Sequence, residues 1–443
     1  MKAYSFPRGG ITLEDATVPR GASSSVAFLP ALSLIPLSGH SGGRLVPLVG
    51  AGDAVREGML VGRSVDGRAA NAHAAVPGRV VRREQWVDGE GRQREGLLVR
   101  MEGSFDLLGR DDKDGFLDLR GGVSGYGELL DALDECGVVE MDGPGRPLTA
   151  ALSEFRRAGG RRSLVVRCVF DDPWLAADRA LCAERLPAVV EGAFVLAGAL
   201  GGVGRVVFAV SRGDRKLGAA MLAASAGRGI PASLVVTGAK YPQRNPRELG
   251  IALRGYERRT KIELGAFLAL GPATLAAARD AAMRRRPVLE RYVAVGGSAV
   301  HSPKVMRVRV GKRIGDLFEE CGGFVGEPLR VVSGSPFFGE RVRYLDEPVT
   351  RTCYALVAML KGQLGGGRTR GCVSCGECRR VCPVGLDPEE LYKAASVSES
   401  AEGDGHPGFR ECHGCGCCEI VCPSRLPLPE AIRGKPLAVD PYE

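Results

Sequence analysis

The chain has 443 residues, of which 44% are hydrophobic and 25% charged. This composition predicts a soluble globular protein of about three or four domains and excludes disorder on a large scale. Lys and Arg number 60 against 52 Asp and Glu, so the net charge is +8, and aromatic residues make up only 6%. This mild excess does not favour nucleic acid as a partner. An acidic redox partner or an anionic membrane surface fits it better, and a solvated basic face explains it equally well.

The most apolar stretch, residues 188–210, is interrupted by Glu191, by two glycines and by Arg205. It therefore predicts a helix followed by a strand rather than a transmembrane helix. The chain opens without the pattern of a signal peptide. We expect any attachment to a membrane to depend on partner proteins or on a surface patch.

Residues 1–115 predict a small β-sandwich of the biotinyl or lipoyl type. Strand-like runs at 46–49 and 59–61 flank a Gly-Asp turn, and a Pro-Gly turn follows at 77–78. Such domains carry their prosthetic group on a hairpin lysine, but this chain has no lysine between Lys2 and Lys113. The sequence thus excludes swinging-arm chemistry and leaves a structural or docking role.

Residues 116–290 predict a Rossmann-like α/β domain. Short apolar runs at 163–169, 205–210 and 232–237 have the character of buried parallel strands, and 178–200 and 216–226 have helical spacing. The glycine-rich stretch 137–148 lies ahead of this pattern. Glycines before a helix allow a phosphate to approach backbone N–H groups, although such a stretch is more often only a turn.

Residues 291–350 predict a small β-grasp module, with strands at 291–295 and 304–310 and a short helix within 314–324. Glycines at 362–367 predict a hinge into the last domain, residues 368–432. Within it, Asp387 is expected to cap a helix, and 396–411 to form a loop. None of the five histidines forms a spaced pair, so each is expected to be exposed and none to be a ligand.

The last domain contains two runs of the form Cys-x2-Cys-x2-Cys-x3-Cys-Pro, at 372–383 and 412–423. This spacing is typical of a bacterial ferredoxin, in which the fourth cysteine of each run binds the other run's cluster. The alternatives are a zinc knuckle, which usually takes two separated ligand pairs, and a disulfide framework, which is typical of small secreted proteins. The pattern predicts two [4Fe–4S] clusters, one held by Cys372, Cys375, Cys378 and Cys422, the other by Cys412, Cys415, Cys418 and Cys382.

Six cysteines remain outside these two sets. Cys417 is predicted to be a packing thiol beside the second set. The others are scattered and indicate buried small residues in a reducing cytosol: Cys136, Cys168, Cys182, Cys321 and Cys353.

The order of these parts resembles the RnfC family, the peripheral component of the Rnf complex, a membrane ferredoxin:NAD oxidoreductase. The resemblance covers nearly the whole chain and rests on 6–11, 52–58, His73-Ala with Pro77-Gly78, 240–243, 316–324 and both cysteine runs. It implies a biotinyl-like domain, an FMN and NADH domain similar to the flavoprotein of respiratory complex I, a soluble-ligand-binding β-grasp and two [4Fe–4S] clusters. In that family, hydride from NADH enters FMN and leaves through the clusters as single electrons, or the reverse.

The chain departs from the family pattern where the flavin is implied to sit. The family's Gly-Gly-Ala-Gly-Phe-Pro-Thr is here 142–148, Asp-Gly-Pro-Gly-Arg-Pro-Leu, in which Pro144 removes a backbone donor and Arg146 replaces an aromatic ring. The family's Asn-Gly-Ala-Glu-Cys-Glu-Pro is here 167–173, and Arg244 stands where a glycine is usual. The resemblance leaves Gly143, Gly145, Asp172 and Lys240 as the candidate flavin or NADH residues, and the departures predict weakened or absent binding.

The main interpretation is an electron-transfer protein on the cytoplasmic side of a membrane, bound to other Rnf-type proteins and exchanging electrons with ferredoxin or a flavoprotein. Arg368, Arg370, Arg379 and Arg380 are candidates for docking an acidic partner or raising a cluster potential. Two alternatives stay open: an intact FMN-dependent NADH dehydrogenase, and a soluble adaptor for an amino-acid reductase such as proline reductase.

Overall fold

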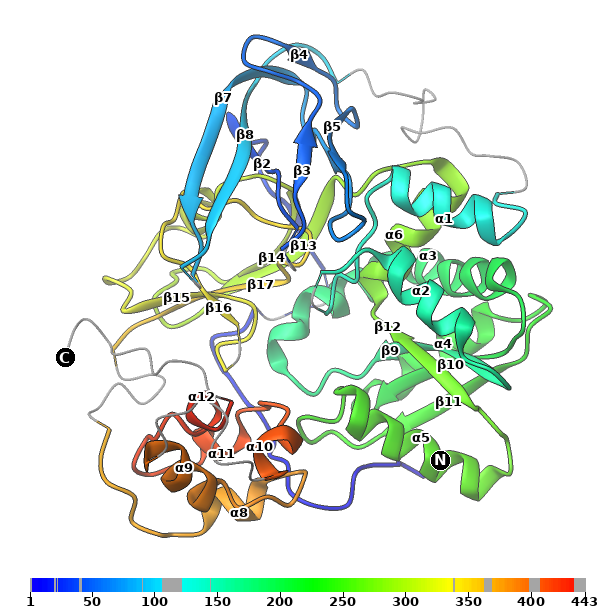
Figure 1. The fold of residues 1–443 in the computed structure, drawn as a ribbon, viewed down its shortest axis with the longest axis vertical. Coiled ribbons are helices and arrows are strands. Elements are labelled where there is room, and N and C mark those ends of the chain that lie inside the picture. The colour runs from blue at the N-terminus through cyan, green and yellow to red at the C-terminus, as the bar shows by residue number, and fades with distance from the viewer. Residues whose placement is uncertain are drawn as a thin grey trace.

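The computed structural model describes residues 2–19, 21, 23–39, 42–89, 91–105, 122–143, 145–337, 339–361, 369–397 and 407–433. The predictions for the hinge at 362–367, Lys113, Pro144, Arg368, His40 and His406 lie outside these residues. In Figure 1 the described parts form an upper β-domain, a helix-rich α/β domain beside it, a central sheet and a small helical domain below.

The N-terminal domain is a β-sandwich, as the alternation of short strands and turns predicts. One sheet has the order β2-β8-β7-β4 and the other β3-β5-β6, and their buried side chains, among them Val61, Leu97 and Val99, form one core. The strands are β2 (Leu32–Pro36), β3 (Leu45–Pro47), β4 (Ala54–Val55), β5 (Leu60–Ser64), β6 (Ala72–His73), β7 (Gly78–Val87) and β8 (Gln93–Met101).

The α/β domain contains a parallel sheet of order β11-β10-β9-β12. Its strands are β9 (Arg162–Cys168), β10 (Val203–Ser211), β11 (Ala232–Thr237) and β12 (Ala266–Leu270). The first three confirm the predicted buried strands. Its helices are α1 (Tyr126–Glu135), α2 (Leu148–Arg157), α3 (Ala176–Leu200), α4 (Arg215–Ala224), α5 (Pro246–Thr260) and α6 (Pro272–Arg284), with short 3-10 turns at Pro173–Leu175 and Arg212–Asp214.

Both faces of this sheet are covered, which explains why its strands are apolar without alternation. One face packs against α3 and α6 in a core that includes Phe208 and Leu275. The other packs against α5 through Leu249 and Leu253. The arrangement leaves the carboxyl ends of the strands as the edge where the loops carrying polar residues meet.

The β-grasp module belongs to a mixed sheet of order β1-β14-β13-β17-β15-β16, with α7 (Ile314–Glu320) packed through Phe318 on the buried core. Its strands are β1 (Ser25–Val26), β13 (Glu290–Gly296), β14 (Lys304–Arg309), β15 (Arg330–Ser333), β16 (Glu340–Arg341) and β17 (Ala355–Met359). The edge strand β1 comes from near the N-terminus and pairs with β14 in parallel, a long-range pairing that the sequence did not predict.

The last domain consists of short helices joined by cysteine-bearing loops. They are α8 (Glu377–Val381), α9 (Pro388–Val397), α10 (Pro407–Glu411), α11 (Cys417–Ile420) and α12 (Leu428–Ile432). Asp387 accepts the backbone N–H of Glu389 and of Glu390 through its side chain, at 3.2 and 3.3 Å, which confirms the predicted cap of α9. The predicted loop at 396–411 is wrong at both ends, because α9 and α10 extend into it.

An extended arm, residues 2–19, connects these domains. In Figure 1 it runs in dark blue from beside α5, past the helical domain, toward the central sheet. None of the helices in the described part of the chain is long and apolar enough to cross a membrane.

Candidate metal centres and the crevice of the α/β domain

The two cysteine runs adopt the same local backbone. In the first, Ser374 and Gly376 have left-handed φ values of 52° and 75°, and in the second Gly414 and Gly416 have 67° and 77°. Gly376 leads directly into the short helix α8, and Gly416 leads into α11. The two runs therefore share the local turn from which three successive cysteines of each could bind one cluster.

Five cysteines from the two runs, Cys417 among them, line one small cavity. Cys382, the last of the first run, meets Cys412, Cys415 and Cys418 of the second run there. The backbone N–H of Leu386 points at the Cys382 sulfur at 3.3 Å, a contact that stabilises a thiolate. We call Cys382, Cys412, Cys415 and Cys418 the inner set. Their grouping supports the crossed ligand assignment that the spacing predicts.

The other four cysteines lie nearer the surface. Backbone and side-chain hydrogen bonds of 3.0 and 2.8 Å join Ser424 to residues 370 and 371, so the end of the second run lies beside the start of the first. Cys378 and Cys422 pack at the edge of a small apolar cluster that includes Leu391 and Leu426. Cys372 and Cys375 are exposed, whereas Cys382 and Cys418 of the inner set are buried. We call Cys372, Cys375, Cys378 and Cys422 the outer set.

Within the described ranges, no three His, Cys, Asp or Glu side chains approach closely enough to bind a single metal ion.

The inner set contacts the α/β domain directly. The Tyr241 hydroxyl donates a hydrogen bond of 2.7 Å to the carbonyl oxygen of Cys415. The His413 Nε2 lies 3.3 Å from Glu248, and its Nδ1 lies 3.1 Å from the side-chain amide of Asn245. The hydrogen bond with Glu248 raises the pKa of His413. The expectation that this histidine is exposed is wrong, because it lies in the domain interface with 25% of its side chain exposed.

The thiol of Cys417 is fully buried, and it belongs to a different apolar cluster from that of Cys418. It packs against Tyr241 and Val381, with Ile11 and Leu13 of the arm nearby. This position supports its predicted role as a packing residue.

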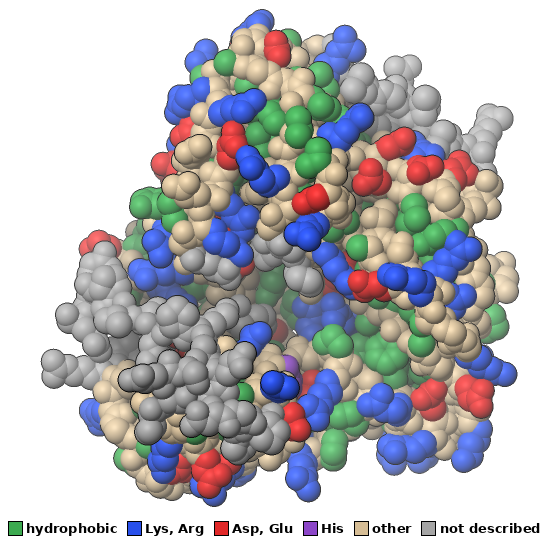
Figure 2. Space-filling model, in the orientation of Figure 1, with side chains coloured by type: hydrophobic (Ala, Val, Ile, Leu, Met, Phe, Trp, Pro, Cys, Tyr) green, Lys and Arg blue, Asp and Glu red, His purple; other side chains and the backbone are tan. Residues whose placement is uncertain are grey.

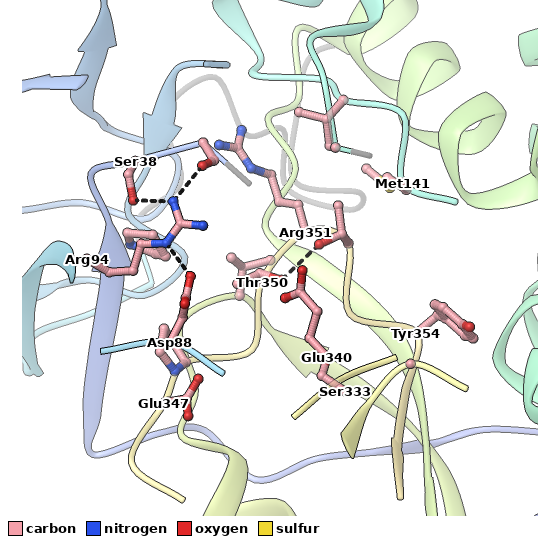
Figure 3. Close-up of a pocket in the computed structure, with 18 of the residues that line it drawn as sticks. Ser38, Asp88, Arg94, Met141, Ser333, Glu340, Glu347, Thr350, Arg351 and Tyr354 are labelled. Carbon is pink, nitrogen blue, oxygen red and sulfur yellow. Dashed lines mark hydrogen bonds and ion pairs between the residues drawn. The ribbon is translucent and has the colours of Figure 1, made fainter. Parts of the chain in front are cut away.

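The candidate flavin residues do not all meet at one place. Gly143 and Gly145 line a cavity of about 390 Å³ between the three larger domains. Figure 3 shows its walls, with Ser38 and Arg94 from the β-sandwich, Met141 from the α/β loop, and Ser333 and Tyr354 from the β-grasp sheet.

The two charged candidates have other partners. Asp172 is buried and accepts the N–H of Trp174 at 3.0 Å, so it caps the 3-10 turn that follows. The Lys240 ammonium donates to the carbonyl oxygen of Gly9 at 2.8 Å and lies 3.9 Å from the centre of the Phe6 ring. Lys240 therefore binds the N-terminal arm, and burial lowers its pKa.

Three residues that sequence reasoning treated as separate departures form one buried group. The Asp142 Oδ2 accepts hydrogen bonds from Arg167 at 2.5 Å and from Arg244 at 3.1 Å. The exposed fractions of the three side chains are only 7%, 10% and 15%. Burial favours the neutral carboxyl, but the two guanidinium groups prevail and lower the pKa of Asp142 to about 2. The sequence did contain a signal for this group. One acidic residue and two arginines occupy three positions that differ from the family pattern, and their opposite charges could have indicated that they pair.

Three family models match the chain. They describe an RnfC barrel sandwich hybrid domain at residues 6–104, an NQRA C-terminal domain of the SLBB type at 292–343 and a 4Fe-4S dicluster domain at 368–426. The chain is 28% identical to the C component of an ion-translocating oxidoreductase complex of Rhodobacter capsulatus, over 82% of this chain and 69% of that protein. The chain is RnfC-like. The matches confirm the predicted fold class and the iron–sulfur character of the last domain.

Two further relatives match most of the chain. The C component of a proton-translocating ferredoxin:NAD(+) oxidoreductase complex of Clostridium ljungdahlii is 26% identical, over 87% of the RnfC-like chain and 83% of that protein. A Na(+)-translocating counterpart of Acetobacterium woodii is 26% identical, over 84% and 82%. Among solved structures, an NAD+-reducing [NiFe]-hydrogenase in the air-oxidized state aligns with a TM-score of 0.48 at 15% identity, covering 69% of this chain and 60% of that one.

The glycine loop of this RnfC-like chain does not fit a flavin phosphate. The Asp142 carboxylate lies at the loop between two arginines, and the N–H of Leu148, which begins α2, is already hydrogen-bonded to Val138 at 3.0 Å. Arg146 turns back to Glu140 and Glu154. The Leu148 N–H is therefore not free for a phosphate at this helix N-terminus, and Asp142 already takes the anion position between the two arginines.

Proposed function

We propose that the chain relays single electrons through two [4Fe–4S] clusters, as a peripheral component of an oxidoreductase complex similar to Rnf. The observation that carries the proposal is that Cys382, from the first run, lines one cavity with Cys412, Cys415 and Cys418 of the second. A cubane cluster changes its charge by one with little movement of its ligands, so two neighbouring clusters form a one-electron path.

The two cysteine sets have different surroundings, so the two ends of this electron path face different parts of the molecule. Cys372 and Cys375 of the outer set are exposed, so a soluble partner can approach its cluster from that side. The inner set is covered by the α/β domain through Tyr241, Asn245 and Glu248. We propose that ferredoxin or a flavoprotein exchanges electrons at the outer set, and that Rnf-type membrane proteins hold the chain at the cytoplasmic face.

Two of the arginines beside the first run are less available for docking than their sequence position indicates. Arg379 is paired with Asp387 at 2.8 Å and with Glu389, and Arg380 is paired with Glu377. Figure 2 shows Lys and Arg scattered among Asp and Glu over the visible face. We therefore propose recognition through the outer cluster's own surroundings rather than through a basic patch.

The test is anaerobic purification followed by iron, sulfide and electron paramagnetic resonance measurements on wild type, Cys382→Ser and Cys422→Ser. We expect about eight iron atoms per wild-type chain. Each variant should hold about half of that iron, because it lacks the fourth cysteine ligand of one cluster. The crossed assignment further predicts that the two variants retain clusters with different spectra. Wild-type iron well below that level after reconstitution, or identical spectra in both variants, would count against the proposal.

A further inference from the structure

The topology of the α/β sheet identifies the position at which this domain is expected to bind a ligand. The chain passes from β9 outward to β10 and β11, then returns to the other side of β9 as β12. In an open parallel sheet, ligands bind at the carboxyl ends of the strands, where the strand order reverses. That place is the crevice between the ends of β9 and β12.

The side chain of Asp142 lies in this crevice. Arg167, which holds its carboxylate, is the penultimate residue of β9. Gly271 directly follows β12, and a Cβ there would lie only 2.3 Å from the Asp142 Oδ2. The Gly271 N–H also hydrogen-bonds to this carboxylate and helps to lower its pKa. A carboxylate thus takes backbone and guanidinium donors of the kind that bind nucleotide phosphates.

The second cation, Arg244, joins the crevice from the loop after β11. Its backbone N–H donates to Asp171 at 2.8 Å, while its guanidinium reaches Asp142. Arg244 therefore holds two carboxylates at once. A phosphate entering the crevice would meet both of these negative charges at close range, in a place where solvent screening is weak.

We propose that Asp142 is an internal anion that occupies the phosphate position of this crevice, held by Arg167 and Arg244, so that the chain binds no flavin nucleotide there. The three changed positions compensate one another. Each arginine alone would leave a buried cation without a partner, and the carboxylate alone would be a buried unpaired charge. Together they keep the fold closed without a cofactor.

Removal of the Asp142 carboxylate should therefore leave a site that binds an added anion. In addition to the guanidinium groups released from Asp142, the Nε atoms of Arg167 and Arg244 have no hydrogen-bond partner among the described residues. An added oxyanion in the vacated space would find several buried donors. Inorganic phosphate is the simplest probe of such a site.

The test compares the full-length chain with its Asp142→Ala variant in thermal unfolding, with and without millimolar phosphate at constant ionic strength. Trp174, fully buried in the α/β domain, reports the transition in a Trp86→Phe background. We expect Asp142→Ala to melt several degrees below wild type and to regain most of that loss with phosphate. Wild type should respond little.

Two controls separate a specific site from general destabilisation. Asp172→Ala removes another buried carboxylate, one that caps a turn, and its expected loss of stability should not be restored by phosphate. Asp142→Ala combined with Arg167→Ala should lose most of the phosphate response. Should the alanine variant not fold, Asp142→Asn is titrated in the same way, because it removes the charge and keeps the shape.

A flavin assay on the same samples completes the test. Wild type incubated with FMN and passed through gel filtration should retain less than a tenth of an equivalent. One tightly held FMN per wild-type chain, or equal phosphate responses in wild type and Asp142→Ala, would overturn the proposal. The iron content of each sample reports separately on the clusters, so failure of the proposed electron relay would be recognised independently.

Discussion

Cys417 and Cys418 are adjacent and both buried, yet their surroundings differ. Both residues line the cavity of the inner set, but Cys418 packs against Leu426 and Leu428, whereas Cys417 packs against Tyr241 and Val381. We predict that Cys418→Ser loses about half of the iron, because one ligand of the inner cluster is gone. Cys417→Ser, a change of the same chemistry one position away, should keep wild-type iron. Equal iron contents in the two variants would refute this assignment.

His73 predicts a dependence of stability on pH at the junction of the β-sandwich and the α/β domain. Burial, helped by the charge of Arg351, lowers its pKa to about 3. The unfolded chain binds a proton below pH about 6.5 and the folded chain does not, so the free energy of unfolding falls as the pH drops from 6.5 toward 3.

At pH 5.5 this loss amounts to about 1.4 kcal/mol. A His73→Gln variant keeps a polar side chain that does not titrate. It should therefore gain a few degrees in melting temperature relative to wild type between pH 7.5 and 5.5. A constant difference between the two proteins over this range would show that His73 is free to take up a proton when folded.

The sequence predicted the chemistry of the candidate ligands more accurately than it predicted which side chains are buried. The cysteine spacing predicted two sets of ligands, since a loop of two residues fixes where a sulfur points. The same reasoning was wrong for His73 and His413, which it placed in solvent, because burial in an interface depends on another domain. It also missed the link among Asp142, Arg167 and Arg244, in which the two arginines lie 25 and 102 residues from the aspartate along the chain.

At the scale of elements, the N-terminal arm was the least predictable part. Residues 2–19 have neither helical nor strand periodicity, yet Ile11 and Tyr241 exchange backbone hydrogen bonds of 3.0 and 2.8 Å, and the Gly10 N–H donates to Val381 at 2.8 Å. By contrast, β9, β10 and β11 were predictable because continuous apolar runs specify buried parallel strands. The arm acquires its conformation only from the two domains that it joins.

The contact of this arm with the inner set predicts an effect of Gly9→Ala. Gly9 has a φ of +56°, and a Cβ there would lie 2.5 Å from the carbonyl oxygens of Val381 and Cys382. Gly67 has a φ of +67° with nothing within 4 Å, so Gly67→Ala has a similar backbone cost without the collision. We expect Gly67→Ala to lose about 1 kcal/mol of stability and no iron. Gly9→Ala should lose iron as well, and equal iron contents in the two variants would contradict this.

On the scale of the whole molecule, the three larger domains are joined at the cavity by Arg351. Its guanidinium donates to the carbonyl oxygens of Asn71 and Gly137 at 2.8 and 2.6 Å, and to that of Ala70 at 3.0 Å. The β-sandwich and the α/β domain are thereby fixed to the segment preceding β17. The small cluster domain packs on these domains through Tyr241 and the arm.

This packing protects the two cysteine sets unequally and predicts the order in which iron is lost. Cys372 and Cys375 of the outer set are exposed, whereas the inner set is covered by the arm and by the loop at 241–248. A chelator or oxygen must reach the iron through solvent, so the outer cluster should be lost first. In wild type we expect iron release in two phases of similar amplitude. Cys382→Ser, which keeps only the outer cluster, should show the fast phase, and Cys422→Ser the slow one. Release in a single phase, or the opposite assignment, would show that the α/β domain does not shield the inner set.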